Sequence, residues 1–227
     1  MSIKENVNLV KERIRNAALI ANRDPNEISL VAVSKNVSYY RILEAIDAGI
    51  LNIGENRVQE LLEKYDNIQK NINWHLIGSL QTNKVKYIID KVGLIHSLDR
   101  ISLAHEINKR AGRIDRRVQA LVQVNMSRES TKSGIYEEEL LSFIKEMANY
   151  PYIDIKGLMT IGPLTEDTNA IRECFCRFRH HFEDLRNKGI DHIDMKYLSM
   201  GMSNDYKIAI EEGANMVRIG RAIFGNE

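Results

Sequence analysis

The 227-residue sequence lacks the features of secreted and membrane proteins. Its longest apolar runs have the length of a strand, and the N-terminal stretch MSIKENVNLVKERI lacks the apolar core of a signal peptide. We therefore expect a cytoplasmic protein without a membrane partner. The only cysteines, Cys174 and Cys176, lie two positions apart in a helical pattern and so point to different sides of the helix. This spacing excludes a disulfide between them and a cysteine metal cluster.

An excess of charge of one sign is also missing, because 32 Lys and Arg residues are balanced by 31 Asp and Glu residues. This balance gives no electrostatic footprint for nucleic acid, so we expect no nucleic-acid partner. The six histidines show no metal-ligand spacing, and none is linked to an acid in the motif of a catalytic triad. No Gly-x-Gly-x-x-Gly motif follows a strand. We expect no metal site.

What the sequence does contain is a regular alternation of β-rich runs and helical segments. Apolar residues from Ile3 to Ala17 keep helical spacing and predict an opening helix, which Pro25 ends. Eight β-rich runs follow, at 29–33, 51–53, 73–77, 93–96, 118–124, 153–159, 195–198 and 216–219. Strands that alternate with helices pair in parallel, and eight of them close into a (β/α)8 barrel.

The predicted fold is therefore α/β, a TIM barrel in a single domain that spans residues 1–227. The pattern predicts no helix after the eighth strand, because the sequence ends at AIFGNE. We expect the N-terminal helix to fill the place of this last barrel helix. Short linkers, none of them rich in Pro, Gly or Ser, favour one domain without an appended unit.

Lys35 follows the first predicted strand directly, at the end where barrels of this kind hold their chemistry. The loops after the seventh and eighth strands, the usual phosphate cradle of a barrel, contain Ser199, Gly201 and Gly220. Glycines let a ligand approach the backbone and leave amide hydrogens free to bind it. An amine that faces a phosphate cradle predicts a Schiff-base site for a phosphorylated aldehyde. The alternative is an ordinary surface lysine in water.

Two classes of ligand fit such a site: a sugar phosphate, as in a lysine-dependent aldolase, and pyridoxal 5'-phosphate (PLP). Arg218 on the last strand favours PLP, because its side chain can donate to the pyridine nitrogen. The alternative for Arg218 is a structural ion pair with an acid. Ser199 and Ser203 precede a predicted helix, so capping of that helix is a further role for them, and Ser203 is the weaker candidate for phosphate contact.

The sequence resembles the pyridoxal phosphate homeostasis protein family over nearly its whole length. That family is similar to the N-terminal barrel domain of bacterial alanine racemase. The resemblance is carried by the motifs LVAVSKN, GENRVQE, WHLIGSLQTNK, LVQVN, TKSGI, GLMTI and LSMGMSNDYKIAIEEGANMVRIGRAIFG. It implies a barrel that binds PLP, with Asn56 of the GEN motif lining the site.

The same resemblance implies a role for each of the other candidate residues. Lys35 would form the internal aldimine with PLP, and Arg218 would lie near the ring nitrogen. The phosphate would contact Ser199 and the backbone around Gly201 and Gly220. From the residues alone, we expect Trp74 and His75 to be packing residues of the third strand. Lys132 of the TKSGI motif is as readily explained as a solvated loop lysine.

The resemblance further implies a non-catalytic protein that serves PLP homeostasis by buffering the cofactor and delivering it to apo-forms of PLP-dependent enzymes. A PLP-dependent amino-acid racemase and a lysine-dependent aldolase remain as alternatives. The related racemases carry a second, β-rich domain that covers the cofactor and supports a dimer. The present sequence stops shortly after the eighth strand, so we expect a monomer with negligible turnover of amino acids.

Overall fold

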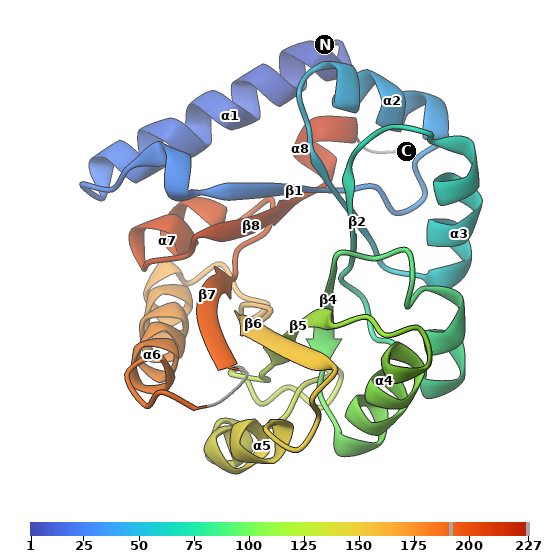
Figure 1. Ribbon diagram of the computed structural model, residues 1–227. Coiled ribbons are helices and arrows are strands. Elements are labelled where there is room, and N and C mark those ends of the chain that lie inside the picture. The colour runs from blue at the N-terminus through green and yellow to red at the C-terminus, as the bar shows by residue number, and fades with distance from the viewer. Residues whose placement is uncertain (191–192, 226–227) are drawn as a thin grey trace.

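Eight parallel strands close into a barrel in the computed structural model, which describes residues 1–190 and 193–225 (Figure 1). The predicted (β/α)8 barrel is confirmed, and the strands follow one another around it in sequence order. They are β1 (Ser29–Val33), β2 (Asn52–Glu55), β3 (Asn73–Leu76), β4 (Leu94–Leu98), β5 (Val118–Gln123), β6 (Ile153–Met159), β7 (Ile193–Ser199) and β8 (Met216–Ile219).

Helices surround the barrel and connect most of the strands. The connection from β3 to β4 differs, since it contains a 3-10 helix at Thr82–Tyr87. Each helix in the described ranges is too short or too polar to span a bilayer. The α-helices are α1 (Ile3–Ile20), α2 (Tyr39–Asp47), α3 (Val58–Asn67), α4 (Ile101–Arg113), α5 (Leu140–Met147), α6 (Thr168–Arg186), α7 (Tyr206–Glu211) and α8 (Arg221–Phe224).

The N-terminal helix α1 packs against α2, α7 and α8 (Figure 1). It begins with a capping box, in which the Glu5 amide donates to the Ser2 hydroxyl and the Ser2 amide donates to the Glu5 carboxylate. The predicted apolar stripe is buried. One expectation is wrong, because the one-turn helix α8 does follow β8. Since α8 is so short, α1 covers the remaining surface between α7 and α2.

Alternate residues of each strand point into the barrel or outward against the helices, because side chains along a strand alternate in direction. The inward set includes a small apolar cluster made of Val31, Leu94, Leu121, Met159 and Met216. The outward set joins the buried faces of the helices in one large core. The same alternation predicts which side chains just beyond the strand ends point toward the barrel mouth.

Candidate functional site

The predicted site residues lie at the carboxyl ends of four strands that are neighbours in the closed barrel, β7, β8, β1 and β2. Each strand supplies one or two of them, either from its last residues or from the loop that follows it. Residues far apart in the sequence are therefore brought to one sector of one barrel face. They are Lys35, Asn56, Ser199, Gly201, Arg218 and Gly220.

Lys35 lies two residues beyond the end of β1 and continues the inward-facing series of that strand. Val31 belongs to the apolar cluster inside the barrel, and the period of two places Val33 and then Lys35 on the same side. Ser34 points the opposite way and is fully buried. The Lys35 side chain is exposed at the barrel mouth. Its amine is therefore accessible to a ligand that enters this face.

The loop after β8 contacts the end of β1 through Gly220. A Cβ atom at Gly220 would lie 2.9 Å from the Val33 carbonyl oxygen, so a larger residue would push the two segments apart. Gly201, in the loop after β7, has a φ of 92° and accepts a hydrogen bond from the Arg218 amide at 3.0 Å. The loop after β8 thus packs against the end of β1, two residues before Lys35. A glycine-containing loop near an amine is the arrangement that a phosphorylated aldehyde would need, since backbone amides can bind a phosphate.

Arg218 is almost completely buried and begins a hydrogen-bonded chain inside the barrel. Its guanidinium donates to the Ser199 hydroxyl at 2.6 Å and to the Thr160 carbonyl at 2.8 Å. Ser199 Oγ lies 3.4 Å from His96 Nδ1, and His96 Nε2 lies 2.9 Å from His75 Nδ1. We call Arg218, Ser199, His96 and His75 the interior chain. It links β7 and β8 with β3 and β4 across the barrel.

Burial determines the charges along the interior chain. It lowers the pKa of His75 to about 4, and it lowers the pKa of His96 well below its usual value, with further contributions from His75 and Arg218. Both imidazoles are therefore neutral at pH 7. Burial also lowers the pKa of Arg218 to about 10, which the charge of Asp205 partly offsets, so the guanidinium stays protonated. One cation and two neutral rings occupy the barrel interior.

The structure refines three of the predictions made from the sequence. The Ser199 hydroxyl is completely buried and bonds to Arg218 and His96, so its observed role is to hold Arg218. Its predicted phosphate contact stays a prediction. His75 was expected to be a packing residue, and instead it ends the interior chain. Trp74 does pack in the core, where its ring lies 6.1 Å from that of Tyr65.

Lys132 is not a solvated loop lysine, because its side chain is only 15% exposed. Its ammonium donates to the Glu129 carboxylate at 2.6 Å, to the Gly162 carbonyl at 2.7 Å and to the Ser127 hydroxyl at 3.2 Å. These bonds connect the loop after β5 with the loop after β6. The structure therefore assigns Lys132 a role in holding two loops together.

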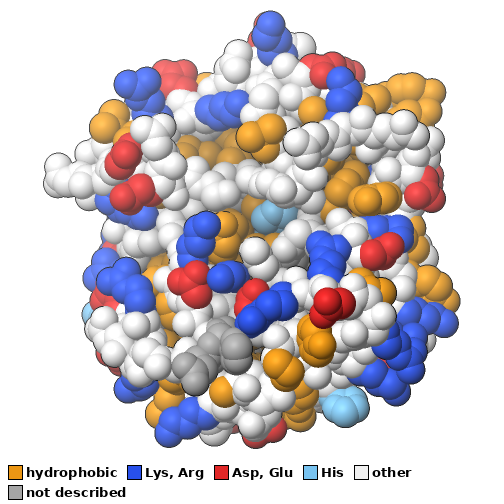
Figure 2. Space-filling view, in the orientation of Figure 1, with side chains coloured by type: hydrophobic (Ala, Val, Ile, Leu, Met, Phe, Trp, Pro, Cys, Tyr) orange, Lys and Arg blue, Asp and Glu red, His pale blue; other side chains and the backbone are white. Residues whose placement is uncertain are grey.

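The face seen in Figure 2 is hollowed at its centre, and a histidine side chain is visible in the hollow among hydrophobic and uncharged atoms. The histidines that lie inside the barrel are His75 and His96. Around the hollow, Lys and Arg side chains alternate with Asp and Glu side chains (Figure 2). This mixed rim matches the balanced charge of the sequence.

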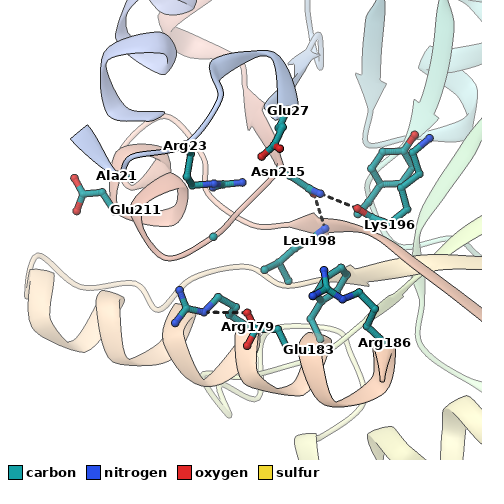
Figure 3. Close-up of a pocket in the computed structure, with 13 residues that line it drawn as sticks. Ala21, Arg23, Glu27, Arg179, Glu183, Arg186, Lys196, Leu198, Glu211 and Asn215 are labelled. Carbon is teal, nitrogen blue, oxygen red and sulfur yellow. Dashed lines mark hydrogen bonds and ion pairs between the residues drawn. The ribbon is translucent and has the colours of Figure 1, made fainter. Parts of the chain in front are cut away.

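A second hollow, of about 660 Å³, lies between the segment that follows α1, the helix α6, the strand β7 and the turn that precedes β8 (Figure 3). Two of its cations have partners: Arg179 pairs with Glu183 at 3.6 Å, and Arg23 donates to two backbone carbonyls. The turn that precedes a barrel strand lies at the end of the barrel that serves stability rather than chemistry. The charged residues that line the hollow are Arg23, Arg179, Arg186, Lys196, Glu27, Glu183 and Glu211.

Comparison with known proteins agrees with the fold. The family model described as alanine racemase, N-terminal domain, matches residues 2–227. Alanine racemase from Streptomyces lavendulae superimposes with a TM-score of 0.75 at 14% identity, over 99% of this chain and 57% of that one. This likeness shows the fold alone. The fold and the family model define a barrel of the alanine racemase N-terminal class.

More similar proteins narrow this class. The pyridoxal phosphate homeostasis protein of Aquifex aeolicus is 42% identical over 226 residues, which cover 99% of this chain and 98% of that protein. PipY of Synechococcus elongatus, solved with PLP bound, superimposes with a TM-score of 0.83 at 31% identity, over 95% of this chain and 100% of that one. The chain belongs to the pyridoxal phosphate homeostasis protein family.

Proposed function

We propose that this protein binds PLP through a Schiff base with Lys35 and serves PLP homeostasis inside the cell. The observation that supports the proposal is the exposed Lys35 side chain two residues beyond the end of β1, where Gly220 of the loop after β8 packs against Val33. PipY, a relative solved with PLP bound, supports the same cofactor. When bound, PLP supplies an aldehyde that reacts reversibly with amines and a ring that withdraws electrons.

The proposal gives each site residue a specific task. The backbone near Gly201 and Gly220 binds the phosphate, and Asn56 lines the opposite side of the site at the end of β2. Arg218 directs a remaining N–H toward the ring nitrogen while Ser199 holds its guanidinium in place. The two ends of the cofactor are then recognised by adjacent strands, and the reactive amine lies between them.

The proposal includes buffering and delivery of the cofactor without turnover of amino acids. A cationic Arg218 at the ring nitrogen keeps that nitrogen unprotonated, which makes the ring a weaker electron sink. An accessible Schiff base suits exchange, because an incoming amine can displace Lys35 and carry the cofactor to an apo-enzyme. We propose that the protein does this as a cytoplasmic monomer.

Borohydride reduction followed by peptide mapping tests the proposal. Reduction converts the C=N bond into a stable amine, so the PLP-loaded protein should carry its pyridoxyl group on Lys35. Lys35→Ala should lose the absorbance of the Schiff base and remain folded, because an exposed side chain contributes little packing. Lys4→Ala, at an exposed lysine on α1, is the control and should keep the absorbance. A label found wholly on another lysine would refute the assignment.

A further inference from the structure

A cluster of three charged residues, two of them buried, lies directly behind Lys35, on the outer side of β1. We call Lys64, Glu55 and Glu60 the Lys64 cluster. The Lys64 ammonium is 2.7 Å from the Glu55 carboxylate and 3.3 Å from the Glu60 carboxylate. The side chains of Lys64 and Glu55 are 8% and 0% exposed, so this ion pair is removed from water. It lies between the barrel and α3.

The cluster bonds the backbone on both sides of Lys35. Before it, the Ser34 carbonyl accepts a hydrogen bond from Lys64 at 2.6 Å, and the Ser34 hydroxyl donates to Glu55 at 2.5 Å. After it, the Asn36 amide donates to Glu60 at 2.9 Å. Asn36 has a φ of 59°, a left-handed conformation that a non-glycine residue adopts at a cost. These bonds hold the turn that carries Lys35.

Such a cluster is a costly way to stabilise a fold. Charges removed from water lose hydration, and apolar residues of similar volume often stabilise as well or better. Within the part of the chain that the structure describes, Glu55 Oε2 is buried without a hydrogen-bond partner. The three N–H donors of Lys64, however, match three acceptors, and one of them is the carbonyl that precedes Lys35. The arrangement specifies a backbone position.

We propose that Lys64, together with Glu55 and Glu60, is a positioning residue that fixes the Ser34–Asn36 turn and so holds the Lys35 amine where it meets the aldehyde. The cluster acts through the backbone and does not touch the cofactor. The inference rests on the proposed function in one respect, the assignment of Lys35 as the amine. It goes beyond that function because it places a determinant of cofactor affinity outside the barrel interior.

Four variants test the inference. Lys64→Met removes the ammonium and leaves a buried carboxylate, so it also destabilises the protein. The double variant Lys64→Met with Glu55→Gln lacks this unpaired charge. It should regain stability, but it does not regain the hydrogen bond from residue 64 to the Ser34 carbonyl. Lys64→Arg keeps a cation with several donors. Lys11→Met is the control, because the Lys11 ammonium also bonds the backbone, at two carbonyls that follow α2, and does not contact the turn.

The melting temperature of each variant is recorded, and two further measurements are made. The first is PLP affinity, from the absorbance of the Schiff base. The second is the hydrogen-exchange rate of the Asn36 amide without PLP, which needs no cofactor. We expect Lys64→Met and the double variant to bind PLP about 10-fold to 100-fold more weakly and to exchange Asn36 faster, since small displacements of a reacting group have effects of this size. Lys64→Arg should recover much of the PLP affinity and of the slow Asn36 exchange. Lys11→Met should change neither quantity.

Recovery of PLP affinity together with melting temperature in the double variant would show that the cluster only stabilises the fold, and would overturn the inference. Unchanged Asn36 exchange in Lys64→Met would overturn it as well. Failure of the proposed function would look different, because the wild-type protein would then lack a pyridoxyl label on Lys35. Asn36 exchange would still decide whether Lys64 holds the turn.

Discussion

At the scale of single residues, Arg218 fixes one end of the interior chain. A guanidinium only donates, so the Ser199 oxygen accepts from it and the Ser199 proton is free to point to His96 Nδ1. In that arrangement His96 carries its proton on Nε2 and donates to His75 Nδ1, which leaves the His75 proton on Nε2. The buried cation thus favours one pair of histidine tautomers.

His75 of the interior chain makes the free energy of unfolding fall as the pH drops. The pKa of His75 is about 4 in the folded protein because of burial, below its usual value near 6.5, so the unfolded protein binds more protons between these pH values. Its full contribution to stability is present above about pH 6.5 and falls as the pH drops, by roughly 2 kcal/mol between pH 6.5 and pH 5. Urea unfolding of the wild-type protein and of His75→Gln, at several pH values between about 5 and 6.5, measures this contribution. An equal loss of stability in both proteins over this range would contradict the prediction.

At the scale of elements, α1 completes the ring of helices although it precedes the first strand. Its buried face contacts elements from the end of the chain, α7 and α8, so the two ends of the sequence are packed together. The period of the apolar residues predicted this helix and its buried face. Its place at the end of the ring of helices was inferred because no helix was predicted after β8. That premise was wrong, since the short helix α8 follows β8.

Packing of α1 can be tested at Ile14, which is 5% exposed on the buried face. Ile14→Ala should lower the free energy of unfolding by about 2 to 5 kcal/mol, because it removes buried methyl groups and leaves a cavity. Glu12→Ala lies on the exposed face of the same helix and should change stability by no more than about 0.5 kcal/mol. Urea unfolding at pH 7 compares the two variants. Equal, small effects would mean that α1 is not part of the cooperative core.

At the scale of the whole molecule, periodic patterns predicted the fold well, because parallel strands and amphipathic helices have local signals. The first predicted strand, 29–33, agrees with β1 at both ends. Contacts across the barrel have no local signal, so the bond between His75 and His96 was missed. Lys64 had a signal that was overlooked: it follows Leu61 by one helical turn on the buried face of α3, where a lysine needs a partner.

The last prediction concerns what the assembled barrel does with an amino acid. Racemisation needs a base on each face of the reacting carbon, and Lys35 is the one base that the proposal places there. Loss of a positioned acid or base typically costs about 100-fold to 10,000-fold in rate. The two histidines of the interior chain do not replace it, because burial lowers their pKa values and makes them weak bases, and their ring nitrogens are engaged with each other.

We therefore expect a yellow protein that racemises or decarboxylates amino acids no faster than free PLP at the same concentration. Mixed with an apo-enzyme, the loaded protein should restore that enzyme's activity, and Lys35→Ala treated in the same way should not. Chiral chromatography of alanine incubated with the protein measures racemisation directly, with free PLP as the control. Steady racemisation that disappears in Lys35→Ala would contradict the proposal and favour the racemase instead, since the same amine would then support turnover rather than storage.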